Sequence, residues 1–143
     1  MYNFIYSSSD IYAPFCLASV SSLLKNNEDI QGNSALYLLS NSISNDNVSK
    51  FQNLCDRFSC QLHVIDTQRV KDLIHARNCK LNFNISSFLR IFLSDLLPQN
   101  VDKALFIDSD TYVFHGITDL YSIPLADSPC AMVPDQPILR KHQ

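Results

Sequence analysis

Residues 104–107 are an apolar run, Ala-Leu-Phe-Ile, which is followed at once by the acidic triplet Asp108-Ser109-Asp110. The run predicts a short strand buried on both faces, and paired acids at the carboxyl end of such a strand are typical of a ligand site in an open α/β sheet. Side chains alternate along an extended chain, so Asp108 and Asp110 are expected to point the same way with Cα atoms about 6–7 Å apart. At that spacing both can reach one divalent cation. The local sequence leaves a plain polar turn open as the alternative.

Composition indicates one soluble globular domain over residues 1–143, with 46% hydrophobic and 17% charged residues. The net charge of −3 and the lack of a Lys/Arg cluster argue against a nucleic-acid partner. No apolar run is long enough to span a membrane, and the N-terminus does not resemble a signal peptide. The five cysteines lack CxxC spacing, so we expect reduced, buried thiols in a cytosolic protein.

Hydrophobic periodicity predicts alternating strands and helices along the chain. Strands are expected at residues 2–6, 35–39, 61–65, 104–107 and 130–133. Helices are expected at 14–25, 48–58, 85–96 and 117–121, with a helical turn at 70–75 and loops at 26–33 and 77–84. This alternation predicts an α/β sheet with mainly parallel strand order.

Four segments carry a resemblance to a known family. They are Ser7-Ser8-Ser9-Asp10-Ile11-Tyr12 after the first strand, Ser86-Ser87-Phe88-Leu89-Arg90-Ile91-Phe92, the segment from Asp102 to Asp110 with its DxD motif, and Gly116-Ile117-Thr118-Asp119-Leu120-Tyr121. In this order and at these separations they resemble the N-terminal half of family 8 glycosyltransferases. Those are retaining enzymes with the GT-A fold that usually take UDP-linked sugars.

The resemblance implies a GT-A, Rossmann-like sheet that forms a single nucleotide-sugar-binding domain over residues 1–143, incomplete because the acceptor-side half is missing. It also implies a donor site and a Mn²⁺ or Mg²⁺ ion held by carboxylates. The implied nucleotide-sugar contacts are Ser9, Asp10, Tyr12, Arg90, Asp108 and Ser109, and the implied metal ligands are Asp108 and Asp110. No catalytic residue is named by these motifs.

The chain departs from the family pattern in two places. Ser9 and Ile11 replace polar residues that usually precede the tyrosine of the first turn. The late motif resembling His-x-x-Gly-x-x-Lys-Pro-Trp, whose histidine binds the metal, has no counterpart, and the chain has no tryptophan. The chain is therefore expected to be a fragment or the product of a truncated gene, with the third metal ligand outside it.

Each implied site residue also has a structural interpretation. Asp10 can cap the helix that begins near Pro14, or bind the nucleotide, or do both. Tyr12 either stacks on a base or packs at the mouth of the sheet. Arg90 is either a solvated side chain or a guanidinium that orients an acidic partner or donor hydroxyls near the DxD motif. Ser109 either meets a ribose or is an ordinary turn serine.

The resulting hypothesis is metal-dependent transfer of a hexose from UDP-glucose or UDP-galactose to a glycan, lipopolysaccharide or lipid-linked acceptor with retention. The resemblance places the reaction in the cytoplasm, at the inner membrane face, with peripheral association through parts that this chain lacks. One alternative is a non-catalytic nucleotide-binding remnant. A remote alternative is a haloacid dehalogenase-type phosphatase, disfavoured because Tyr112 stands where a Thr or Val is expected.

Overall fold

The computed structural model describes residues 1–68, 70, 72, 74 and 88–133. In these residues a four-stranded parallel sheet has the order β3-β2-β1-β4. Its strands are β1 (Tyr2–Ser9), β2 (Ser34–Asn41), β3 (Cys60–Asp66) and β4 (Leu105–Phe106). The α/β class and the parallel strand order predicted from the sequence are thus confirmed.

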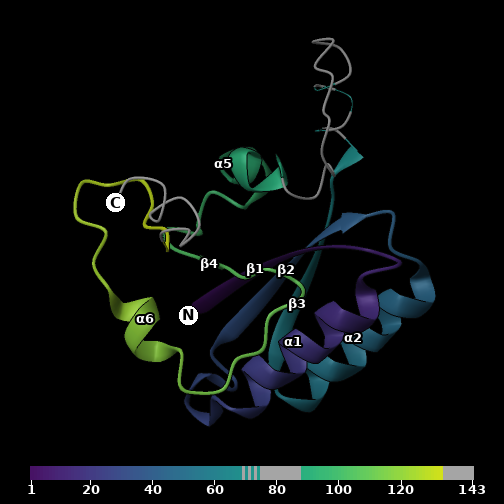
Figure 1. Ribbon diagram of the computed structural model, residues 1–143, viewed down its shortest axis with the longest axis horizontal. Helices are drawn as coiled ribbons and strands as arrows, with labels where there is room; N and C mark the ends of the chain where they lie inside the picture. The colour runs from purple at the N-terminus through teal and green to yellow at the C-terminus, as the bar shows by residue number, and fades with distance from the viewer. Residues whose placement is uncertain (69, 71, 73, 75–87, 134–143) are drawn as a thin grey trace, which may run out of the picture.

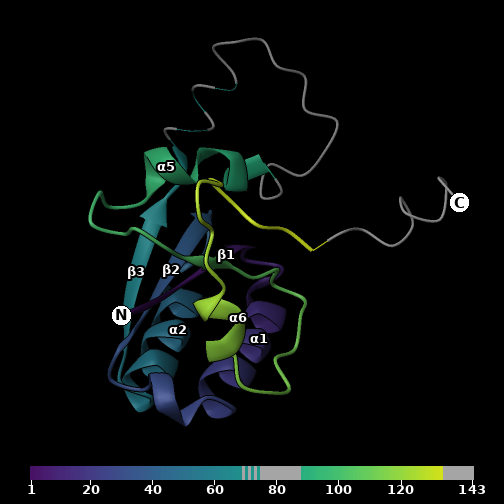
Figure 2. The same ribbon diagram turned by 90° about the vertical axis from the view of Figure 1, so that its left-hand side faces the viewer.

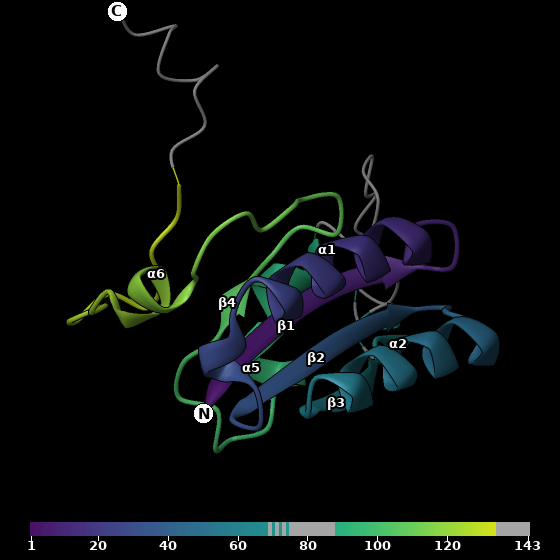
Figure 3. The ribbon, with the colours of Figure 1, turned by 90° about the horizontal axis from the view of Figure 1, so that it is seen from below.

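Helices cover both faces of the sheet (Figures 1 and 2). On one face lie α1 (Ala13–Lys25) and α2 (Asn45–Arg57), and from below they run alongside β1, β2 and β3 (Figure 3). On the other lie the 3₁₀ helix η2 (Leu89–Phe92) and the short α5 (Leu93–Leu96). The first six residues of β2 are buried, as expected for a central parallel strand covered on both sides.

Local sequence signals account for the two long helices. Pro14 occupies the first turn of α1, where its missing N–H costs no hydrogen bond. Ser44 is the N-cap of α2, and its hydroxyl accepts a hydrogen bond from the Asn47 backbone N–H. Phe51 and Cys55 follow at helical spacing and are fully buried against the sheet. The helices predicted at 14–25 and 48–58 are confirmed, the second beginning three residues earlier.

The register of the strands determines where their ends meet. β1 and β2 pair along their whole length, from Tyr2 beside Ser34 to Ser9 beside Asn41. β4 pairs only with the middle of β1, with Phe106 beside Ile5. The chain after β4 therefore continues beside the last residues of β1 and reaches its carboxyl end.

The interpretation of residues 104–107 as a strand buried on both faces was wrong. β4 has two residues, both half-buried, and Ile107 is the buried member of the run. Its residues are only half-buried because, in the described part of the chain, β4 lies at the edge of the sheet and pairs with β1 alone. An apolar run does not distinguish an edge strand from a central one.

The amphipathic helix predicted at 85–96 changes type within its described part. Its described part consists of η2 and then α5, and residues 85–87 lie outside the described residues, as does the loop predicted at 77–84. The apolar side chains nevertheless pack on the sheet as the periodicity indicated: Leu89 is fully buried, and Phe92, Leu93 and Leu96 pack beside it. The hydrophobic period indicates which face is buried, but it does not set the spacing of the hydrogen bonds.

The strand predicted at 130–133 was also wrong. These residues have no regular structure, and the side chains of Met132 and Val133 are 82% and 89% exposed. They pair with none of the described strands, and β-propensity depends on such a neighbour. Elsewhere the loop at 26–33 contains a short 3₁₀ helix, Glu28–Ile30, and the helix at 117–121 is confirmed as α6 (Thr118–Ser122).

Two further expectations concern helicity and thiols. The described residues 68, 70, 72 and 74 are helical, in agreement with the predicted turn, whose remaining residues lie outside the described part. The free cysteines at 16, 55 and 60 are buried as predicted, whereas Cys130 is exposed and Cys79 lies outside the described residues. Among the helices that the structure describes, none has the length and apolar character needed to cross a bilayer.

Candidate functional site

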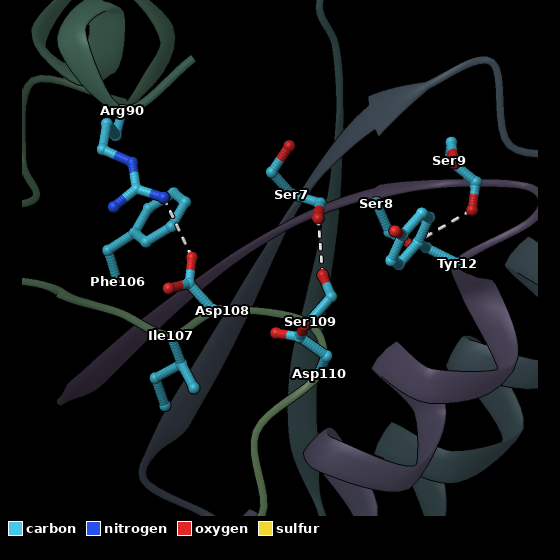
Figure 4. Close-up of a pocket in the computed structure, with 10 residues that line it drawn as sticks. All are labelled: Ser7, Ser8, Ser9, Tyr12, Arg90, Phe106, Ile107, Asp108, Ser109 and Asp110. Atoms are coloured by element: carbon cyan, nitrogen blue, oxygen red, sulfur yellow. Dashed lines mark hydrogen bonds and ion pairs between the residues drawn. The ribbon is translucent and has the colours of Figure 1, made fainter. Parts of the chain in front are cut away.

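A pocket of about 350 Å³ opens at the carboxyl ends of β1 and β4. The chain passes from β1 to β2 on one side, while β4 lies on the other side of β1. The pocket thus lies at a topological switch point, where open α/β sheets bind their ligands. Its walls are formed by Ser7, Ser8, Ser9, Tyr12, Arg90, Phe106, Ile107, Asp108, Ser109 and Asp110 (Figure 4).

The acidic pair lies on a turn rather than on an extended strand. The strand ends at Phe106, and the backbone N–H of Thr111 donates to the Asp108 carbonyl oxygen at 3.2 Å. The Thr111 hydroxyl donates to the same oxygen at 2.8 Å. The period-two argument for Asp108 and Asp110 therefore does not describe their backbone. Both residues still line the pocket, as the sequence predicted, because the turn bends around its rim.

Ser109 fastens this turn to β1. Its hydroxyl donates to the carbonyl oxygen of Ser7 at 2.5 Å, across the seam between the two segments (Figure 4). Ser109 also lines the pocket, so the predicted contact with a sugar donor stays a prediction. The neighbouring Ser7 hydroxyl is buried and has no hydrogen-bond partner within the described residues.

Arg90 forms an ion pair with the first of the two acids. Its Nη2 lies 2.9 Å from the Oδ1 of Asp108, with the two side chains 45% and 56% exposed. The guanidinium carbon lies 4.8 Å from the centroid of the Phe106 ring. Of the two alternatives left open by the sequence, the structure has the guanidinium on an acidic partner in the DxD motif. η2 positions this side chain on the pocket from the face opposite α1.

The opposite wall of the pocket is formed by Tyr12 and Ser9 (Figure 4). The backbone N–H of Tyr12 donates to the Ser9 carbonyl oxygen at 3.1 Å, which closes the turn between β1 and α1. The Tyr12 side chain is 45% exposed, and its ring centroid lies 6.0 Å from that of Phe15. This wall thus offers an accessible aromatic face and no charge.

Asp10 lies apart from the other predicted site residues. It does not line the pocket, and its Oδ1 accepts hydrogen bonds from the Ser44 backbone N–H at 2.9 Å and the Asn47 side-chain amide at 2.7 Å. The expected cap on α1 is therefore wrong: the N-cap of α1 is Tyr12, without a side-chain cap bond. The backbone N–H of Ser44, followed by further hydrogen bonds from Ser44 and Asn47, lowers the pKa of the Asp10 carboxyl.

Sequence reasoning missed Ser7, Ser8, Phe106 and Ile107 as pocket residues. Phe106 could have been predicted from the sequence. It precedes Asp108 by two positions, and side chains two positions apart on an extended chain lie on the same side of it. Ser7 and Ser8 belong to the first segment that carries the family resemblance, but they were not named as site residues, because hydroxyls at a strand end carry no signal of their own.

The donors present suit a hard cation. Asp108 and Asp110 offer carboxylate oxygens in one pocket, and Mg²⁺ is commonly held by one or two carboxylates together with water and substrate phosphates. Within the described ranges, no group of three His, Cys, Asp or Glu side chains gathers at one point. Asp108 and Asp110 are thus the two carboxylates that this pocket offers, and the expectation of a third ligand beyond this chain stays a prediction.

Comparison with known families identifies the chain. Residues 3–143 match the family described as Glycosyl transferase family 8. The chain belongs to glycosyl transferase family 8. The match covers all four segments that suggested the resemblance, and it favours a transferase over the phosphatase alternative.

Curated relatives of this family 8 chain are considerably longer. It is 25% identical over 125 residues to a Haemophilus influenzae protein provisionally named as a glycosyltransferase. It is also 25% identical over 124 residues to the glycosyltransferase GlyA of Streptococcus pneumoniae. Each match takes in 87% of this chain, but only 36% and 16% of the respective relative. The chain thus spans a minor part of the curated relatives it matches.

Solved structures confirm the GT-A-type fold. The galactosyltransferase LgtC, crystallised with donor and acceptor sugar analogues, superposes with a TM-score of 0.68 and 20% identity, covering 86% of this chain and 43% of that chain. The bifunctional glycosyltransferase WbbM superposes with a TM-score of 0.66 and 25% identity, covering 87% of this chain and 21% of that chain.

Proposed function

We propose that this family 8 chain forms the donor side of a metal-dependent, retaining hexosyltransferase that takes a UDP-sugar. One observation carries the proposal: the acidic pair, Arg90 and Tyr12 all line a single pocket at the switch point of the sheet. A nucleoside diphosphate has an aromatic end and an anionic end. The pocket offers Tyr12 on one wall and charged groups on the other, which matches that division (Figure 4).

The proposed roles follow from the chemistry of each side chain. Asp108 and Asp110 would hold a Mn²⁺ or Mg²⁺ ion, which supplies charge neutralisation for the diphosphate leaving group when bound. Tyr12 would stack on the base, with Ser9 beside it. Arg90 would orient Asp108 and donate to donor hydroxyls, since a guanidinium presents several N–H groups in one plane.

The identities of the donor sugar and of the acceptor make the proposal more specific. We propose UDP-glucose or UDP-galactose as the donor and a glycan, lipopolysaccharide or lipid-linked molecule as the acceptor. These choices rest on the family resemblance. The same holds for a cytoplasmic location at the inner face of the membrane.

The test is calorimetric titration of UDP into the chain with and without Mn²⁺. We expect binding that requires Mn²⁺, and Asp110→Asn to weaken it by at least about tenfold, since hydrogen bonds and contacts to charged groups contribute about 1.5–3 kcal/mol. Asp127→Asn is the matched control, because Asp127 is an exposed acid outside the pocket. UDP binding that is indifferent to Mn²⁺ and to Asp110→Asn would contradict the proposal.

A second candidate is a nucleotide-binding remnant without catalysis. It is favoured by the fact that the chain spans 36% and 16% of its curated relatives. Hydrolysis of a UDP-hexose distinguishes the two functions. Turnover that is lost in Asp110→Asn supports the transferase, whereas Mn²⁺-dependent UDP binding without turnover supports the remnant.

A further inference from the structure

Three hydroxyl groups in a row join the core of the sheet to the acidic turn, residues 108–111. The Tyr6 phenol oxygen lies 3.1 Å from the Ser19 hydroxyl oxygen, which in turn lies 3.1 Å from the Thr111 hydroxyl oxygen. The Thr111 hydroxyl lies 2.8 Å from the Asp108 carbonyl oxygen. Tyr6 on β1 and Ser19 on α1 are fully buried, whereas Thr111 is exposed. This hydroxyl row therefore leads from the core to the rim of the pocket.

The direction of the hydrogen bonds in the hydroxyl row follows from the number of protons. A carbonyl oxygen can only accept, so the single hydroxyl proton of Thr111 is donated to Asp108. Thr111 must then accept from Ser19, and this bond uses the one hydroxyl proton of Ser19. Ser19 therefore accepts from Tyr6. Burial raises the pKa of the Tyr6 phenol, so this group keeps the proton that it donates.

The hydroxyl row is the second of two attachments between β1 and the acidic turn. The first is the hydrogen bond from the Ser109 hydroxyl to the Ser7 carbonyl oxygen (Figure 4). Both acids of the pocket, Asp108 and Asp110, lie on this turn. Hydrogen bonds that are donated in one direction polarise one another, so removal of the first donor weakens the bonds that follow. A change at Tyr6 should thus reach the acidic turn through two intervening side chains.

We propose that Tyr6 is a positioning residue, whose buried phenol fixes the acidic turn through the hydroxyl row and so increases the affinity of the acidic pair for a divalent cation. The Thr111 hydroxyl and backbone N–H both donate to the Asp108 carbonyl oxygen and thereby close the turn. Two carboxylates on a closed turn lose less conformational freedom when they bind one cation. The cation part of this inference rests on the proposed function, whereas the attachment of the turn rests on the contacts alone.

The attachment is tested by NMR without metal, through the chemical shift of the Asp108 carbonyl carbon, which moves upfield when its oxygen accepts weaker hydrogen bonds. We expect Tyr6→Phe, which keeps the buried ring, to move this signal upfield, because the Thr111 hydroxyl becomes a weaker donor. Thr111→Val, a change at an exposed position, should move it further upfield. In a Thr111→Val background, Tyr6→Phe should add nothing, since the last bond of the hydroxyl row is already gone.

The cation part is tested by measuring Mn²⁺ binding, with free Mn²⁺ followed by electron paramagnetic resonance. Thr111→Val is expected to weaken binding by about two- to tenfold, the equivalent of the roughly 0.5–1.5 kcal/mol that one hydrogen bond contributes. Tyr6→Phe should weaken it by about two- to threefold, because it weakens that bond without removing it. Ser22→Ala is the matched control, because the Ser22 hydroxyl lies on the same helix but accepts from the Val113 N–H, outside the hydroxyl row. This variant also loses a hydrogen bond, yet its Mn²⁺ affinity should not change.

Several outcomes decide against the proposal. An Asp108 carbonyl signal that does not respond to Tyr6→Phe would overturn the attachment. Loss of Mn²⁺ affinity in Ser22→Ala as large as that in Tyr6→Phe would show a general effect of packing, and unchanged affinity in Tyr6→Phe would overturn the cation part. A wild-type chain that binds no Mn²⁺ would overturn the proposed cation site together with the cation part of this inference. In that case the Asp108 carbonyl signal still decides the attachment of the turn.

Discussion

At the scale of single residues, two neighbouring serine hydroxyls have opposite roles at the seam between β1 and the acidic turn. The Ser109 hydroxyl donates to the Ser7 carbonyl oxygen at 2.5 Å and thereby joins the turn to the strand. The Ser7 hydroxyl is buried without a partner in the part of the chain that the structure describes. A made bond contributes to stability, whereas a buried polar atom without one costs free energy.

We predict that Ser109→Ala lowers the free energy of unfolding by about 1 kcal/mol, because it removes a hydrogen bond that no other group replaces. Ser7→Ala is the matched control, and it should leave the stability unchanged or raise it. Urea unfolding followed by circular dichroism measures both. A cost for Ser7→Ala as large as that for Ser109→Ala would contradict this account of the seam.

At the scale of elements, α1 carries a polar stripe that holds the chain leaving the site. Ser19 shares a hydrogen bond with the Thr111 hydroxyl at 3.1 Å, and the Ser22 hydroxyl accepts from the Val113 N–H at 2.9 Å. Asn26 donates to the Val113 carbonyl oxygen at 2.6 Å. Residues spaced three and four apart share one helix face, so this stripe guides the segment after the acidic turn along α1.

A second contact between elements joins the first turn to α2 and is sensitive to pH. The Ser44 N–H lowers the pKa of Asp10, so the folded value lies below the unfolded value of about 3.9. The contact is therefore complete above that pH and is lost as the pH falls through the folded value. We predict that the Ser44 amide proton shift titrates in the wild type with a midpoint below about 3.9. It should not titrate in Asp10→Asn, and a midpoint at or above the unfolded value would contradict the contact.

At the scale of the whole molecule, the described part leaves apolar surface and a sheet edge uncovered. β4 pairs with β1 alone among the described strands, and Phe114, Met132 and Val133 are 73%, 82% and 89% exposed. Exposed strand edges and clustered apolar side chains favour association with further chains. The net charge of −3 opposes association only weakly.

We predict that the chain self-associates as its concentration rises, measured by sedimentation velocity. Phe114→Ser should reduce the association, because it removes one exposed aromatic ring, which otherwise contacts only the exposed ring of Tyr112 among the aromatic contacts described. Asn53→Ser, an exchange at an exposed position on α2, is the control and should have no effect. A monomer at every concentration, with a single cooperative unfolding transition, would contradict the prediction.

Much of the fold could be predicted from the sequence, because the type of each element depends on the local spacing of its apolar residues. The alternation of apolar strands and amphipathic helices predicted the parallel α/β sheet, and Pro14 indicated the start of α1. The segments around Tyr12, Arg90 and Asp108 predicted the family and pointed to one pocket. The structure does bring these three residues together, although their roles toward a sugar donor stay predictions.

What the sequence by itself determined was therefore the type and order of most elements and the set of polar residues at their ends. The tertiary structure alone decided which of those residues meet: it turned the Asp10 carboxylate away to α2, stacked Arg90 on Phe106, and left β4 at the sheet edge of the described part. The reason is physical, because spacing along the chain specifies neighbours within one helix or strand. Contacts between elements depend on strand register and packing, which no local pattern contains.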